Sequence, residues 1–218
     1  MKIEKRESRK ERIKRKIKEE ISKAYRHKRL IVGIISLIVL IAIYLFKDSP
    51  SVILRYSTFI GLIVTFSIID HLFDIRFHLK HYFFIIIIGG VSILFYYLYF
   101  TYPQYDKLQH FILPMFLCSI IFFMINKLKL ALKWKITFTF FSVAGLLGMF
   151  EIGEYLLDLF FNLKLQGVYI RDLKGLEKFN LILNPLDDTM ADMSFGLLGS
   201  SIYAMYAWIK YSKSHRMN

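Results

Sequence analysis

The sequence contains a single cysteine, Cys118, among 218 residues. One cysteine cannot form a disulfide within the chain, and it cannot build a cysteine-based zinc site. Because Cys118 lies in an apolar run, we interpret it as a residue that packs between helices. The sequence also lacks a glycine-rich phosphate loop, a nucleophile elbow and internal repeats. Any chemistry therefore has to come from other residue types.

Charge is scarce outside the N-terminal tail. Residues 1–29 carry 14 of the 30 Lys and Arg residues, and the rest of the chain is close to neutral, with 16 basic and 12 acidic residues. The tail thus supplies +9 of the formal net charge of +13, so the basic character belongs mainly to the tail and we expect no nucleic-acid partner. The anionic lipids of the cytoplasmic leaflet are its expected partner. An apolar stripe of Ile13, Ile17, Ile21 and Tyr25 fits either a helix on the membrane surface or a solvated helix that only fixes topology.

Apolar residues dominate the remaining chain. The sequence is 56% hydrophobic and 17% aromatic, with a mean hydropathy of +0.44. Six apolar runs lie at 30–46, 52–69, 82–101, 108–126, 134–160 and 188–209. Each is near the length of about 20 residues that crosses a bilayer as a helix. The sequence predicts an all-α, polytopic membrane helix bundle of about six transmembrane helices, with domains at 1–29, 30–209 and 210–218.

The distribution of Lys and Arg predicts the orientation. With the N-terminus inside, the inner segments hold 23 of these residues and the outer segments hold 7. We therefore expect a multi-pass protein of the cell membrane, surrounded by lipids, with both termini in the cytoplasm. The polar residues of the 70–81 segment, which include Asp70 and His81, are interpreted as part of a hydrated inner loop. The sequence indicates no oligomeric state.

Ionisable residues inside a membrane are costly and mark functional sites. Three groups of them recur at helical spacing in the last three runs, in YDKLQHF, EIGEYLLD and DDTMADM. In the predicted topology all three groups lie at a similar depth near the outer face, each on one helix side. The predicted site therefore contains Asp106, His110, Glu151, Glu154, Asp188 and Asp192, with Asp158 extending the stripe of the fifth run.

Five carboxylates and one imidazole cannot all stay charged and unpaired in one membrane layer, which leaves three alternatives. A divalent ion (Mg²⁺, Mn²⁺, Fe²⁺ or Zn²⁺) could be bound by all six residues. Protons could neutralise some carboxylates, as in proton- or cation-coupled transport. Cations such as Lys107 and Arg171 could instead pair with them in a non-catalytic envelope protein. The first alternative predicts a metal-dependent enzyme acting on a membrane or envelope amphiphile, with Glu151, Glu154 and Asp188 as catalytic groups.

Small residues accompany the acids. Gly148 precedes Glu151, and Gly196 and Gly199 continue the stripe of the last run, which predicts close approach of helices there. Pro114 follows His110 by four residues. It either interrupts the hydrogen bonding of a helix that already runs through that point, or marks the first turn of a helix that starts late.

The three motifs, in this order, resemble the DUF2238 (YjdF-like) membrane protein family, and more distantly the VanZ-like proteins. Asp106, Lys107, His110 and Phe111 match D-K-x-x-H-F, and Glu151 and Glu154 match E-x-x-E. Asp188, Thr189, Asp192 and Met193 match D-T-x-x-D-M. The resemblance covers residues 82–205 and implies an integral membrane protein without a particular activity. The VanZ-like resemblance implies, by analogy, a role at the cell envelope.

Overall fold

A computed structural model describes residues 50–161, 163, 165–171 and 179–215, together with positions 11, 12, 34, 37, 38, 41 and 45. Apart from those single positions, the basic tail and the first predicted span lie outside the described residues. The boundaries predicted for these two segments therefore stay predictions.

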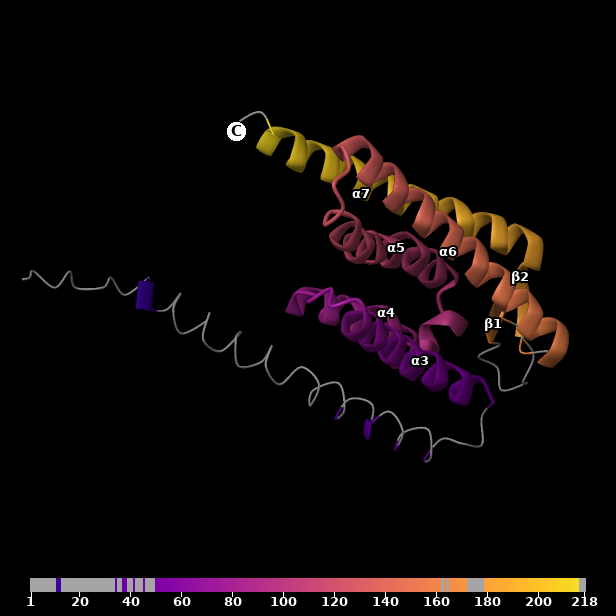
Figure 1. Ribbon diagram of the computed structural model, residues 1–218. Coiled ribbons are helices and arrows are strands. Elements are labelled where there is room, and N and C mark those ends of the chain that lie inside the picture. Colours follow the sequence, from indigo (N-terminus) through magenta and orange to yellow (C-terminus); the bar gives the residue numbers. More distant parts are fainter. Residues whose placement is uncertain are drawn as a thin grey trace, which may run out of the picture.

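The described chain is mostly helical and contains one two-stranded hairpin (Figure 1). In order, its elements are α3 (Pro50–Leu72), α4 (Leu79–Leu94), the 3₁₀ helix η1 (Tyr96–Phe100), α5 (Pro103–Ile125), α6 (Leu132–Phe161), β1 (Val168–Arg171), β2 (Phe179–Leu183) and α7 (Pro185–His215). β1 and β2 pair antiparallel, with a register shift between Val168 and Tyr169.

Successive long helices run in alternating directions, and α5 lies in the middle of the bundle, against α4, α6 and α7 (Figure 1). The 73–78 and 126–131 connections meet at one end, where Lys127 Nζ donates to the carbonyl of Ile75. At the other end α6 leads into the β hairpin and α7 begins. We call this second end the hairpin end.

Five of the predicted runs coincide with helices, with three corrections. The run at 82–101 is not one helix, because α4 ends at Leu94 and η1 follows. The fourth helix begins at Pro103, where proline suits the first helical turn, and not at 108. The sequence predicts an all-α bundle, yet the segment between α6 and α7 forms a β hairpin, so the described chain is not purely helical.

Two of the helices, α5 and α6, are long and apolar enough to cross a membrane. The total of six spans stays a prediction. In α5, Pro114 is buried and lies inside the helix, so the carbonyl of His110 lacks its usual amide partner.

The predicted small-residue contacts bring α7 close to its neighbours. A Cβ at Gly199 would lie 2.1 Å from the carbonyl oxygen of Phe111 on α5. A Cβ at Gly196 would lie 2.6 Å from Leu147 Cδ1 on α6. Gly148 is less tightly placed, with Met193 Cε at 4.0 Å. The first two glycines thus let α7 pack tightly against α5 and α6, and Cys118 is buried in the same region as predicted.

The 70–81 segment is not a simple hydrated loop, which corrects our interpretation of two of its residues: Asp70 lies in the last turn of α3 and His81 in the first turn of α4. Asp70 is buried and accepts hydrogen bonds from the amide of Phe77, at 3.0 Å, and from the hydroxyl of Tyr82. The His81 side chain is fully buried among aromatic rings, and neither ring nitrogen has a hydrogen-bond partner. The sequence carries one signal of this burial, because the aromatic residues Phe77 and Tyr82 lie close to His81 along the chain.

The start of α7 is fixed by Asn184. Its side-chain oxygen accepts the amide of Asp187 at 2.9 Å, while its side-chain nitrogen donates to the Asp187 carboxylate at 2.5 Å. Pro185 fills the first helical position, where no amide is needed. This reciprocal cap uses Asp187 and leaves Asp188 and Asp192, four residues apart, on another face of the helix.

Candidate functional site

The acids of the last three helices converge at the hairpin end. α5 supplies Asp106, Lys107 and His110 from its first two turns, and α7 supplies Asp188 and Asp192. α6 adds Glu151, which lies next to His110. We call these six residues, with Glu154, the polar cluster.

Lys107 is the hub of the polar cluster. Its ammonium group donates to Asp106 Oδ2 at 2.9 Å, to Asp192 Oδ1 at 2.6 Å and to Asp188 Oδ1. The side chains are only 13% (Lys107), 5% (Asp188) and 2% (Asp192) exposed. One cation thus holds three carboxylates from two helices, in a region where water cannot solvate them fully.

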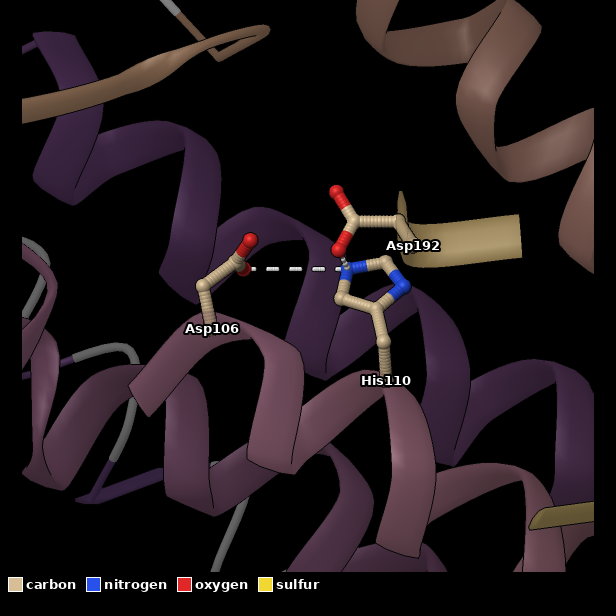
Figure 2. Close-up of side chains that lie close together, drawn as sticks. All are labelled: Asp106, His110 and Asp192. Carbon is tan, nitrogen blue, oxygen red and sulfur yellow. Dashed lines mark ion pairs between the residues drawn. The ribbon is translucent and has the colours of Figure 1, made fainter. Parts of the chain in front are cut away.

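His110 lies between the carboxylates of all three helices. Its Nε2 is 3.7 Å from Asp106 Oδ1 and 3.8 Å from Asp192 Oδ1, and Figure 2 shows these two contacts. Its Nδ1 is 3.8 Å from Glu151 Oε1. One ring nitrogen therefore faces two carboxylates of α5 and α7, while the other faces a carboxylate of α6.

Three of the six predicted metal ligands form a compact group. Ligand atoms of Asp106, His110 and Asp192 all lie within 4.8 Å of one another. Two carboxylates and an imidazole are a donor set that suits a divalent transition metal or Mg²⁺. Among the described residues, this group has the spacing that could hold a metal ion.

The other three predicted residues lie around this group. Glu151 is buried and borders His110 from the side opposite the two aspartates. Glu154 lies one turn further along α6 and interacts electrostatically with Glu151 and with the three aspartates of the cluster. Asp188 is buried and is held by Lys107 and by the amide of Gly167, at 2.7 Å from Asp188 Oδ2.

Asp158, which follows Glu151 and Glu154 on α6, binds backbone amides. Its two carboxylate oxygens accept the amides of Leu165, at 2.7 Å, and Gln166, at 2.8 Å. Asp158 therefore fixes the segment that leaves α6, at the edge of the polar cluster.

From the sequence, Lys107 is only one of several cations that could pair with the acids. The side chain of Arg171, the other cation named, lies outside the described part of the chain. Lys107 follows Asp106 directly, and helical spacing alone does not show that it reaches α7. The contacts of residues 165–167 were also missed, because backbone amides leave no signal in a sequence.

A bundle of apolar helices that buries several ionisable groups is typical of helical membrane proteins. A family model described as "Predicted membrane protein (DUF2238)" matches residues 28–213, and the chain belongs to this family. No curated protein and no solved structure matches the chain. The resemblance to the YjdF-like family agrees with this match, while the VanZ-like resemblance stays a prediction.

Proposed function

We propose that this membrane protein binds a divalent metal ion at Asp106, His110 and Asp192, and is a metal-dependent enzyme that acts on a membrane or envelope amphiphile. The observation that carries the proposal is the approach of these three ligand atoms to within 4.8 Å, from two helices. We propose further that the site lies beneath the outer surface of the cell membrane, as the distribution of basic residues predicts.

The charge balance of the polar cluster supports an added cation. Five carboxyl groups, those of Asp106, Glu151, Glu154, Asp188 and Asp192, gather around two basic groups, Lys107 and His110. Buried carboxylates without a counter-charge are costly, so an unbalanced cluster favours either bound cations or bound protons. A divalent ion supplies two positive charges in the space where His110 already faces two carboxylates.

The surroundings of His110 fit the role of a metal ligand. Metal-binding histidines usually have a carboxylate or carbonyl at the ring nitrogen that does not touch the metal. Glu151 is placed at that nitrogen, 3.8 Å from Nδ1. In this arrangement Nε2 holds the ion together with Asp106 and Asp192, and Glu151 orients the imidazole.

A bound ion would polarise a phosphoryl or acyl oxygen, or activate a water molecule. Glu154 would then be the carboxyl group that exchanges protons with the reacting groups, while Lys107 holds Asp106, Asp188 and Asp192 in place. Hydrolysis of a phosphoryl or acyl amphiphile is the reaction class that this set of residues favours.

A second candidate follows from Lys107. Because its ammonium already bonds to three carboxylates, the polar cluster could serve only to fix helix packing, as in a non-catalytic envelope protein. Transport is less well supported. Beyond the cluster, the contacts between α5 and α6 centre on the apolar group of Cys118, Val143 and Leu147, and the Thr139 hydroxyl donates to the Lys135 carbonyl of its own helix at 2.8 Å.

Metal binding separates the first candidate from the second. We would purify the full chain in detergent, remove metals with a chelator, and titrate Mn²⁺, Mg²⁺ and Zn²⁺ into wild type, Asp192→Asn and Asp187→Asn. Asp187 is the matched control, because it is an aspartate of the same helix, five residues before Asp192, but belongs to the cap. We expect one ion per wild-type chain, unchanged binding for Asp187→Asn and at least tenfold weaker binding for Asp192→Asn. Equal binding by all three, or none by wild type, contradicts the proposal.

Activity needs a separate assay. Proteoliposomes containing phosphatidylglycerol, phosphatidylethanolamine or a polyprenyl phosphate would be incubated with the preferred ion, and the released water-soluble products measured. We expect release from at least one of the three with wild type and none with Asp192→Asn. Metal binding without release from any of them would leave a metal-binding protein and refute the proposed hydrolysis of these lipid classes.

A further inference from the structure

The short segment Leu165–Gly167, between α6 and β1, crosses the hairpin end next to the polar cluster. We call it the strap. Its three successive amides all donate to carboxylates, two to Asp158 and one to Asp188. The side-chain nitrogen of Gln166 also donates to Thr189 Oγ1 at 3.1 Å. The strap thus joins the end of α6 to the start of α7.

The strap is built to hold anionic oxygens. Consecutive amides that point to one side form a concave site for anions, and such a turn needs a residue with positive φ. Gly167 has φ 93°, a conformation that other residues rarely adopt. The carboxylates of Asp158 and Asp188 occupy this turn, so the strap is held closed largely by charge-assisted hydrogen bonds.

The strap and the polar cluster share one carboxylate. Asp188 Oδ1 accepts from Lys107 and its Oδ2 accepts from Gly167. β1, the strand that follows the strap, packs against η1 and α5 at the end of the bundle where α7 begins (Figure 1). The strap and hairpin together therefore extend from α6 and α7 towards η1 and α5, across the end of the bundle where the cluster lies.

We propose that the strap is a gate that controls access to the polar cluster, with Asp158 and Asp188 as its latches. The gate gives entry from the hairpin end, where the headgroup of an amphiphile would arrive. This proposal rests on the proposed function in one respect, because the site that the gate covers is the polar cluster. Because Asp188 bonds both to the strap and to Lys107, opening the gate also changes the contacts of the hub cation.

Thiol accessibility tests the gate without any metal. In a Cys118→Ala background, Glu151→Cys places one thiol in the cluster, where the native side chain is only 5% exposed. Its rate of reaction with a small charged methanethiosulfonate is compared with and without Asp158→Asn, which removes a latch outside the cluster. Asp187→Asn is the matched control, and Leu186→Cys, at a side chain 66% exposed, reports on general changes in reactivity.

We expect Asp158→Asn to raise the labelling rate of the Glu151→Cys thiol at least tenfold. Asp187→Asn should leave that rate unchanged, and the Leu186→Cys rate should be the same in every background. Gly167→Ala provides a second route, because a side chain at φ 93° strains the same turn, and it should also raise the rate. Unchanged labelling in the variants that fold, judged by their elution as a single species, overturns the gate. Since no metal is present, this result is independent of the metal titration.

Discussion

Replacing Lys107 by methionine should cost much of the stability of the bundle. Methionine keeps the length and most of the volume of the side chain, so the change removes the ammonium group with little change in packing. Asp106, Asp188 and Asp192 then lose the cation that they share, in a region where Lys107 is 13% exposed.

The magnitude follows from the burial of the partners. Removing one member of a buried ion pair costs about 3–5 kcal/mol, because the remaining charge is left uncompensated. Hydrogen bonds to charged groups contribute about 1.5–3 kcal/mol each, but the three of Lys107 act as a unit and are not additive. We therefore expect a loss of about 3–5 kcal/mol, which is a large part of the 5–15 kcal/mol typical of folded domains.

The assay is equilibrium unfolding in mixed micelles, followed by circular dichroism, in metal-free buffer. Lys107→Arg keeps the charge and should lose less than Lys107→Met. Adding Asp188→Asn to Lys107→Met should recover part of the loss, because one of the unpaired carboxylates is then neutral. If Lys107→Met were as stable as wild type, the ammonium would not be the counter-charge of the polar cluster.

Two further predictions concern helix packing. Gly199→Ala should lower the unfolding midpoint by an amount equivalent to about 1–3 kcal/mol, because its new Cβ meets the Phe111 carbonyl. Gly145→Ala, which has open space around its Cβ, should not lower the midpoint. Equal effects of the two substitutions would contradict the close approach of α7 and α5. Asp70→Ala should destabilise by about 2–3 kcal/mol, because a buried amide and a buried hydroxyl lose their acceptor. The exposed Asp74→Asn, which keeps a residue type that tolerates a φ of 44°, should lose less than about 1 kcal/mol in the same assay. A stable Asp70→Ala variant would show that this turn is held by its aromatic contacts alone.

The helices could be predicted from the sequence because apolar length is a local property. The runs at 52–69, 134–160 and 188–209 lie within α3, α6 and α7. The break after Leu94 could not, because YYLYF contains no charge, proline or glycine that would interrupt the apolar run. The β hairpin could not be predicted either, because its strands are only four and five residues long.

The convergence of the polar cluster could be predicted in outline, because helical spacing and depth depend only on residue numbers. Which atoms meet could not. Asp188 and Asp192 share a face of α7, yet one bonds to the strap and the other faces His110. That difference depends on the rotation of α7, which Gly199 and Gly196 set through their contacts with α5 and α6.

The most direct test of the account is the coordination of a bound ion by His110. Purified protein would be loaded with one equivalent of Mn²⁺ and studied by pulsed electron paramagnetic resonance, which detects nitrogen nuclei bound to the ion. We predict a histidine nitrogen signal in wild type that persists in His81→Gln and disappears in His110→Gln. A bound Mn²⁺ with no nitrogen signal, or a signal that survives His110→Gln, would show that the ion is not held by Asp106, His110 and Asp192.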